Sequence, residues 1–152
     1  MFVSIRPYLP SDWDAVRQIH DTSRRIELKL AGLDEAFLPF QIAADREDFF
    51  SYPGIFVAEV SGKVVGFSAC SEDELAWLYV DPNYMRIGIA KKLISHMFSQ
   101  FPHICHVEVL AGNTPAKILY ESIGFQQVDT AHGKMPGNEN FPVTVYLYER
   151  IL

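Results

Sequence analysis

The chain has 152 residues, of which 49% are hydrophobic and 21% charged, and its formal net charge is -6. We predict a single domain over residues 1–152, because this length lets one domain bury about two-thirds of the surface of its unfolded chain. The negative charge argues against non-specific nucleic-acid binding. The sequence contains neither a secretory leader nor an apolar run of about 18 residues, so we predict a cytoplasmic protein without membrane association.

The first third of the chain predicts a strand, a helix and a less regular segment. Phe2–Tyr8 has the composition of a strand, and Ser11-Asp12-Trp13-Asp14 resembles the capping box that begins a helix. Residues at helical spacing give this helix an apolar stripe of Trp13, Val16 and Ile19. From Glu27 to Pro53, glycine and proline interrupt short helical pieces, so no long element is expected there.

The rest of the chain alternates strands and helices without repeats. Ile55–Val60 and Val64–Cys70 are predicted strands joined by a tight turn at Ser61-Gly62, which is a hairpin pattern. The remaining expected elements are a strand over Glu74–Val80, a helix from about Gly88 to Phe101, a strand over Ile104–Leu110, a helix around Tyr120, and strands after Phe125 and over Val143–Tyr148. Hairpins followed by strand–helix–strand units favour an α/β (mixed α+β) fold with a central mixed sheet flanked by helices.

The segment Leu78–Ala90, with the sequence LYVDPNYMRIGIA, runs from an apolar strand through a proline turn into a helix start. The first backbone N–H groups of a helix lack intrahelical acceptors and carry the positive end of the helix dipole, which attracts anions. Gly88 and Ala90 have no bulky side chains, so a diphosphate could lie directly on the backbone. Arg86, Lys91 and Lys92 favour an anion here, since no acidic residue occurs between Tyr84 and Val107.

A second pattern covers a strand ending at Asn113 and a helix ending at Gly124. Thr114 is the expected N-cap, with proline at the first helical position and Gly124 as the left-handed exit. The buried face of this helix is expected to consist of Ala116, Leu119, Tyr120 and Ile123. Tyr120 is the polar member of that face, and a buried phenol normally needs a hydrogen-bond partner.

Together the two segments resemble the acetyl-CoA-binding half of the GNAT superfamily, the Gcn5-related N-acetyltransferases. In that family an Arg or Gln is followed three residues later by Gly and five later by Gly or Ala, as at Gly88 and Ala90. The family's closing pattern places Ala, Tyr and Gly-Phe at fixed distances after Asn. All of its positions match, at Asn113, Ala116, Tyr120, Gly124 and Phe125. The resemblance implies a mostly antiparallel, twisted sheet of six to seven strands flanked by about four helices.

The resemblance also implies acetyl transfer from acetyl-CoA to a primary amine of a small molecule or peptide by direct attack in a ternary complex, with no metal. Its implied cofactor-binding residues are Leu78, Tyr79, Val80, Met85, Arg86, Ile87, Gly88, Ile89, Ala90, Lys91, Asn113 and Tyr120. The implied catalytic residues are the backbone N–H of Leu78 for the oxyanion, Tyr120 as general acid and Glu74 as general base. Many family members deprotonate the amine through a water relay instead, and a strand-edge carboxylate facing water explains Glu74 about equally well.

Met85 departs from the family pattern, because it stands where the family has Arg or Gln. This keeps a second interpretation open, in which the chain is a non-catalytic acyl-CoA-binding sensor or regulatory domain. Tyr120 likewise has a structural alternative, a core tyrosine bonded to a backbone carbonyl. Exposed sheet edges and the apolar C-terminal strand permit a homodimer.

The acceptor is the least defined part of the prediction. Glu72, Asp73, Glu74 and Asp81 form an acidic group with no cation between Val64 and Met85, which favours a cationic acceptor such as an amine. A solvated turn explains part of this group equally well. We expect the segment Glu27–Pro53 and a loop over His132–Pro142 to shape the acceptor pocket.

Overall fold

The computed structural model describes residues 1–152. The strands are β1 (Ser4–Pro7), β2 (Gly54–Val60), β3 (Lys63–Cys70), β4 (Glu74–Val80), β5 (His106–Leu110), β6 (Gln126–Met135) and β7 (Asn138–Glu149). The helices are α1 (Trp13–Leu30), α2 (Phe40–Arg46), α3 (Ile89–Gln100) and α4 (Thr114–Ser122), and short 3-10 turns occur between some of them.

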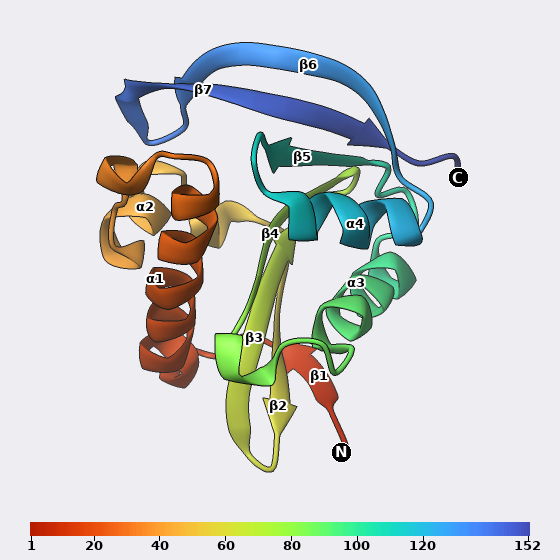
Figure 1. Ribbon diagram of the computed structural model, residues 1–152. Coiled ribbons are helices and arrows are strands. Elements are labelled where there is room, and N and C mark those ends of the chain that lie inside the picture. Colours follow the sequence, from red (N-terminus) through yellow and green to blue (C-terminus); the bar gives the residue numbers. More distant parts are fainter.

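All seven strands form one sheet with the order β1-β2-β3-β4-β5-β7-β6. Every neighbouring pair is antiparallel except β4 and β5, which run parallel. The predicted mixed, mostly antiparallel sheet with four flanking helices is therefore confirmed. The β6–β7 hairpin extends across the top of the molecule in Figure 1, above both pairs of helices.

Helices cover the two faces of the sheet, and each face has its own apolar core. α1 and α2 lie on one side of the central strands and α3 and α4 on the other (Figure 1). The core under α3 and α4 includes Leu93, Val107 and Tyr120, while that under α1 and α2 includes Phe40 and Trp77. None of the helices combines the length and the apolar composition needed to span a lipid bilayer.

A β-bulge in β4 opens the centre of the sheet. Ala69 pairs with Trp77 and Cys70 pairs with Leu75, so Ala76 is an extra residue without a partner on β3. The parallel pairing with β5 covers only Glu74 and Leu75 and stops at this bulge. Because a bulge bends and twists a strand, the rest of β4 separates from β5. The two strands thus leave a gap in the sheet whose backbone groups are available to a ligand.

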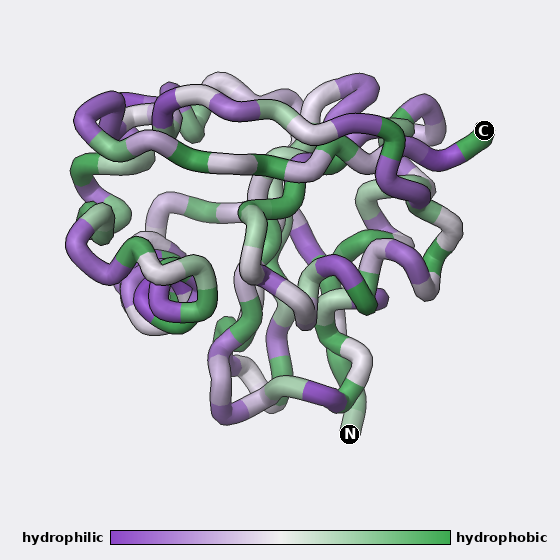
Figure 2. Tube along the Cα trace, turned by 45° about the horizontal axis from the view of Figure 1, so that its top comes forward, coloured by the Kyte–Doolittle hydropathy of each residue, from purple (hydrophilic) through white to green (hydrophobic).

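The predicted loop over His132–Pro142 is wrong, because most of this segment belongs to the β6–β7 hairpin. β6 extends to Met135 and β7 begins at Asn138, which leaves only a two-residue turn. Hydrophobic and more polar residues alternate along β7 from Phe141 to Leu147, as expected for a strand with one face toward solvent, whereas β6 is mostly polar and exposed. Figure 2 shows the hairpin coloured by hydropathy. This alternation compensates for the glycine, proline and asparagine that suggested a loop.

Two helix starts also differ from the prediction. The N-cap of α1 is Asp12 rather than Ser11, and no capping box forms there: the Asp12 carboxylate accepts hydrogen bonds from Arg6 and from the Leu9 N–H at 2.8 Å. The N-cap of α4 is Asn113 rather than Thr114, and its side chain accepts a hydrogen bond from the Ala116 N–H at 3.2 Å. Asn113 is therefore fixed in place by the helix that it begins.

Candidate active site

A run of free backbone N–H groups lies at the start of α3. Between Met85 and Lys91 no N–H group donates a hydrogen bond within the protein, and the first bond of the helix runs from Lys92 N–H to the Gly88 oxygen at 3.0 Å. Gly88 is the N-cap and has a φ of 86°, a left-handed conformation that glycine adopts without steric cost. These N–H groups and the helix dipole together suit an anion, at the position where the sequence predicts one. We call residues 85–91 the anion loop.

The side chains of the anion loop face in different directions. Met85, Arg86 and Ile87 are exposed, whereas Ile89 is buried in the core under α3. Arg86 also has a positive φ of 64°. Ile89 can therefore contribute only its backbone, and the loop presents mainly main-chain donors to a ligand.

An apolar slot leads from the anion loop into the gap between β4 and β5. It is lined by Ser23, Ile26, Glu27 and Leu30 of α1, Leu78, Tyr79 and Val80 of β4, Pro82, Met85 and Ala90 around the loop, and Asn113, Pro115, Ala116, Leu119 and Tyr120 at α4. Ile26, Leu30 and Met85 are 40–60% exposed, which leaves apolar surface for a ligand to cover. The slot suits a long, weakly polar chain.

The edge of β4 that lines the slot has free backbone groups. The N–H of Asp81 donates to Val65 of β3, so strand alternation directs the main-chain groups of Leu78 and Val80 away from β3. The Val80 oxygen accepts a hydrogen bond from the Ser23 hydroxyl at 2.8 Å. Val80 therefore keeps only its N–H for a ligand, while Leu78 offers both groups.

Glu27 of α1 connects three elements around the slot. Its Oε1 accepts hydrogen bonds from the Tyr79 hydroxyl at 2.9 Å and from Arg24 Nη1 at 2.6 Å, and its Oε2 accepts one from Asn113 Nδ2 at 2.9 Å. This carboxylate thus holds α1, β4 and the start of α4 together beside the gap in the sheet. Such a fixed polar network keeps the slot in one shape before any ligand binds.

Tyr120 of α4 brings a buried hydroxyl to the gap. Tyr120 is 6% exposed, and its hydroxyl forms no hydrogen bond within the protein. Burial and the nearby Glu27 charge raise the pKa of Tyr120, so its phenol stays protonated. Tyr120 borders both the apolar slot and a narrow slit with Glu27, Leu78, Glu108 and Asn113 along its wall. A protonated phenol without a fixed partner can donate a proton to a group in this slit.

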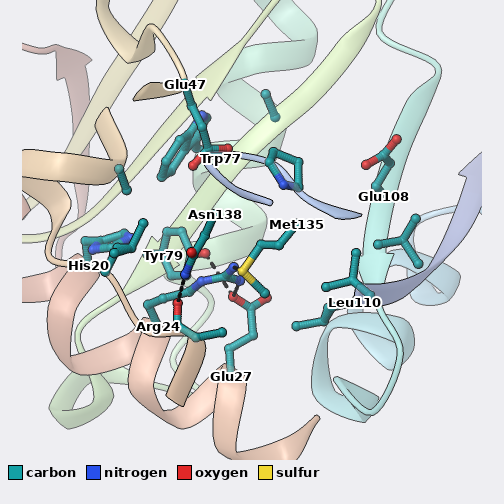
Figure 3. Close-up of a pocket in the computed structure, with 17 residues that line it drawn as sticks. His20, Arg24, Glu27, Glu47, Trp77, Tyr79, Glu108, Leu110, Met135 and Asn138 are labelled. Atoms are coloured by element: carbon teal, nitrogen blue, oxygen red, sulfur yellow. Dashed lines mark hydrogen bonds and ion pairs between the residues drawn. The ribbon is translucent and has the colours of Figure 1, made fainter. Parts of the chain in front are cut away.

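A deep cavity of about 170 Å³ lies on the α1–α2 side of the same gap (Figure 3). Its walls include His20, Arg24 and Glu27 of α1, Leu38, Ala43 and Glu47 around α2, Trp77 and Tyr79 of β4, Glu108 and Leu110 of β5, and Met135, Pro136 and Asn138 of the β6–β7 turn. Arg46 Nη1 donates to the Gly137 oxygen and Asn138 Nδ2 to the Ala36 oxygen, both at 2.9 Å. These two hydrogen bonds hold the hairpin turn in place, so that the turn covers the cavity.

Carboxylates line a second pocket that adjoins the deep cavity and shares Glu47, Trp77 and Glu108 with it, and we call this pocket the mouth of the cavity. Glu74 also lies there, with Arg46 and Tyr52. Burial raises the pKa of Glu47 to about 7, more than the Arg24 charge lowers it. Burial and the neighbouring charge of Glu108 also raise the pKa of Glu74. Glu47 can therefore take up a proton near neutral pH, and these carboxylates attract cations when they are ionised.

The predicted site residues are only partly brought together. Leu78, Asn113 and Tyr120 meet at the slit, and the anion loop joins them through the apolar slot. Glu74 lies instead at the mouth of the deep cavity and does not border the slit. Tyr79 differs from the other predicted cofactor-binding residues, because its hydroxyl points to Glu27 between the slot and the deep cavity.

Sequence reasoning missed the polar residues of α1 and β5 that line these cavities. Arg24 and Glu27 continue the stripe of Trp13, Val16 and Ile19 at helical spacing, and polar residues on a sheet-facing stripe are a signal for a site. Glu108 alternates with the buried Val107 and Val109, so it must face the α1–α2 side. Glu47 carried no comparable pattern.

These features define a class of protein. A mixed sheet that splits between two parallel strands, a helix start with free N–H groups at one end of the split and an acidic cavity at the other suit a transferase that joins an anionic, chain-like donor to a second substrate. Residues 51–127, about half of the chain, match the family model of the acetyltransferase (GNAT) domain. It therefore belongs to the GNAT acetyltransferase family.

Two curated relatives carry the similarity further. A peptidyl-lysine N-acetyltransferase, YiaC, of Escherichia coli is 34% identical over 87 residues, which cover 57% of this chain and 59% of that protein. A [ribosomal protein bS18]-alanine N-acetyltransferase of Haemophilus ducreyi is 31% identical over 96 residues, covering 56% of this chain and 66% of the relative. The matched regions thus span less than two thirds of either relative.

Solved structures share the whole fold. A GCN5-related N-acetyltransferase from Rhodopseudomonas palustris superposes with a TM-score of 0.76 at 22% identity, over 98% of this chain and 95% of the other. The PaiA N-acetyltransferase of Thermoplasma acidophilum, in complex with coenzyme A, gives a TM-score of 0.69 at 16% identity, with both chains fully covered. At these identities the similarity establishes the fold.

Proposed function

We propose that this protein is an acetyl-CoA-dependent N-acetyltransferase that acetylates the primary amine of a peptide or small molecule by direct attack in a ternary complex. The observation that carries the proposal is the slit, where the apolar slot and the deep cavity meet beside Leu78 and Tyr120. A domain that only senses an acyl-CoA has no need for this second cavity, so we favour the enzyme over that alternative.

The residues present fit acetyl-CoA. The free N–H groups of the anion loop suit a diphosphate, and the apolar slot with the N–H groups of Leu78 and Val80 suits the pantetheine arm. Because main-chain groups bind the diphosphate, Met85 in place of Arg or Gln removes no essential donor. When bound, acetyl-CoA supplies a thioester whose carbonyl carbon is open to attack by an amine.

The slit provides the groups that this reaction needs. As the amine nitrogen bonds to the acetyl carbon, negative charge grows on the carbonyl oxygen, and the Leu78 N–H is placed to hold it. The carbon–sulfur bond would then break, and the Tyr120 hydroxyl would protonate the leaving sulfur and regain a proton, through water, from the one removed from the amine. Losing one oxyanion donor typically costs about 3 kcal/mol, so the Leu78 N–H matters even though no side-chain substitution removes it.

We assign the removal of the amine proton to Glu108 acting with Glu74. Glu108 borders both the slit and the deep cavity, whereas Glu74 lies behind it at the mouth. The raised pKa of Glu74 suits a group that receives a proton passed on from Glu108 by water. Glu74 remains part of the proposed base, although it does not border the slit as Glu108 does.

The deep cavity favours a narrow amine as acceptor. Its volume of about 170 Å³ is below the 300–1,000 Å³ that is usual for pockets holding bulky ligands, and the β6–β7 turn roofs it. The carboxylates at its mouth suit a positively charged chain. The two relatives act on peptidyl lysine and on the alanine of a ribosomal protein, and both names support a peptide amine as acceptor here.

A direct assay tests the proposal. The purified protein is mixed with acetyl-CoA and with peptides, polyamines and amino acids in turn, and released CoA is followed with a thiol reagent while mass spectrometry identifies the acetylated product. Amine-dependent CoA release is expected with at least the peptides. Tight acetyl-CoA binding by calorimetry without CoA release above background would contradict the proposal and favour the binding-only domain.

A further inference from the structure

Arg24 of α1 brings a guanidinium into the wall of the deep cavity without using most of its donors. Its side chain is 22% exposed and its neighbours include Glu27, Tyr79 and Met135 (Figure 3). One N–H bonds to Glu27 at 2.6 Å, and a second makes a long contact of 3.6 Å with the Met135 sulfur. A guanidinium has five N–H donors, so the other three have no acceptor within the protein.

The direction of this guanidinium is fixed before any ligand arrives. Glu27, which holds it, is itself fixed by hydrogen bonds from Tyr79 and Asn113. The Met135 side chain on the other side of Arg24 is buried, so the guanidinium has little room to turn. Preorganised donors of this kind select a ligand that supplies the matching oxygen, because any other ligand leaves them unpaired.

We propose that Arg24 makes the deep cavity selective for the α-amine of a peptide, by donating hydrogen bonds to the carbonyl oxygen of the peptide's first residue. This inference rests on the proposed function. Glu27 borders the slit as well as the deep cavity, so its partner Arg24 lies next to the place where the amine reacts. An oxygen bound to Arg24 would therefore lie at the Glu27 end of the deep cavity, on the side of the slit.

The two kinds of peptide amine differ in this respect. In a peptide's N-terminal residue, only one carbon separates the α-nitrogen from the carbonyl group. In a lysine side chain, four methylene groups separate the nitrogen from the main chain, and no oxygen lies near it. Arg24 can therefore bind the carbonyl oxygen next to an α-amine, whereas a lysine amine has no such oxygen to offer.

Charge favours a peptide carbonyl over the carboxylate of a free amino acid. Arg24 is already paired with Glu27, so the charge of the pair is close to zero. The other ionisable side chains of the deep cavity include Glu47 and Glu108, which repel the carboxylate of a free amino acid. A neutral carbonyl accepts the Arg24 hydrogen bonds without that repulsion.

The test uses internal competition between both amines of one molecule. A tryptic digest of bovine serum albumin contains many peptides that end in lysine, and each carries a free α-amine and a lysine amine. Wild-type protein, Arg24→Gln and Arg25→Gln are each incubated with this digest and acetyl-CoA, and tandem mass spectrometry gives the ratio of α- to lysine acetylation. Arg25 is the matched control, because it lies on the same helix but packs over the Phe37 ring outside the cavity.

We expect Arg24→Gln to lower the ratio of α- to lysine acetylation by about 10- to 100-fold, as for the loss of a charge-assisted hydrogen bond, with Arg25→Gln unchanged. The inference is judged by how this ratio changes from wild type to variant. Its absolute value does not count, because an α-amine loses its proton at lower pH than lysine and is favoured chemically in every variant. Arg24→Lys keeps the charge, should give an intermediate ratio and serves if Arg24→Gln does not fold.

Two results would overturn the inference while the proposed function stands. One is equal loss of both kinds of acetylation in Arg24→Gln, since that is the behaviour of a merely structural residue. The other is a wild-type protein that acetylates only lysine. If wild-type protein binds acetyl-CoA but acetylates neither amine, the proposed function itself fails.

Discussion

The two sides of the proposed active site are built from different kinds of chemical group. On the cofactor side, the anion loop and the open edge of β4 present main-chain N–H groups held by one strand, one loop and one helix that are continuous in sequence. On the acceptor side, the deep cavity is made of side chains from α1, α2, β4, β5 and the β6–β7 turn. The first side is thus a property of backbone shape and the second a property of residue choice.

This difference predicts which substitutions each side tolerates. A main-chain donor survives almost any substitution that keeps the backbone conformation, so the cofactor side should depend on glycine and on few side chains. A side-chain cavity changes its preference with each residue, so the acceptor side should be where related proteins diverge. Five substitutions test this division, and the largest effects are expected where the two sides meet.

Replacing Tyr120 with Phe tests the meeting point itself. We expect turnover to fall about 10- to 1000-fold, because the leaving thiolate loses its proton donor, while the dissociation constant for acetyl-CoA changes little. Steady-state kinetics with saturating acceptor and calorimetry measure the two quantities. Tyr148→Phe is the control, since Tyr148 lies in the same core with a buried hydroxyl that has no partner. Unchanged turnover in Tyr120→Phe would remove the acid role from this residue.

Replacing Glu108 with Gln tests the acceptor side for catalysis. We expect turnover to fall about 10- to 100-fold at neutral pH, because the amine keeps its proton. Glu74→Gln should cost less and should weaken the loss of activity toward acid pH, since the raised pKa of Glu74 contributes to that loss. The measurement is a pH profile of kcat/KM, with Glu121→Gln on α4 as control. A larger effect at Glu74 than at Glu108 would make Glu74 the primary base.

Gly88→Val tests whether the cofactor side depends on backbone shape. An L-residue in the left-handed region costs about 1–2 kcal/mol, so we expect acetyl-CoA to bind roughly 5- to 30-fold more weakly if the loop changes conformation to avoid this strain. Gly62→Val is the matched control, because Gly62 has a similar φ of 78° and equally open surroundings but lies in the β2–β3 turn. Equal affinities of the two variants for acetyl-CoA would contradict a main-chain site.

Glu47→Gln should separate stability from acceptor binding. The pKa of Glu47 is about 7 in the folded protein and 4.5 ordinarily, so the folded state holds a proton that the unfolded chain releases between these values. Stability therefore falls as pH rises through this range. After allowance for solvent screening, we expect the variant to be more stable than wild type by about 1–2 kcal/mol at pH 8 and equally stable near pH 4.5.

Urea unfolding at both pH values measures this difference, and acceptor KM measured at pH 8 shows what the carboxylate contributes to binding. We expect a higher KM for a cationic peptide, because the ionised Glu47 attracts it. Lower stability of Glu47→Gln at pH 8 would show that the Glu47 carboxylate stabilises the fold.

The division also explains what could be predicted from sequence. The cofactor side was predictable because backbone sites require particular residues at fixed spacing, such as Gly88 after the strand and Asn113 before its helix. The order of elements followed from hydrophobic periodicity, which depends on neighbours in sequence. Asn113 as the cap of α4 was missed because Thr114 has the same capping chemistry one position later.

The acceptor side could not be predicted in the same way. Arg24, Glu47 and Glu108 are brought together by contacts between segments far apart in the chain, and no local pattern encodes their meeting. Glu74 was expected as the base only from the family resemblance, which does not reveal that the bulge at Ala76 separates it from the slit. The β6–β7 hairpin was missed because its glycine and proline residues suggest a loop when the pairing partner is unknown.

The hydrogen bonds at Glu27 have a consequence for how the protein acquires its site. They join residues 52 and 86 positions apart in the chain, so they can form only after long loops have closed. Contacts of such long range form late in folding, whereas the β2–β3 hairpin and α3 need only local ones. We therefore expect the β2–β3 hairpin and α3 to form before the site does, and a nascent chain to remain unable to bind both substrates until α1 has docked.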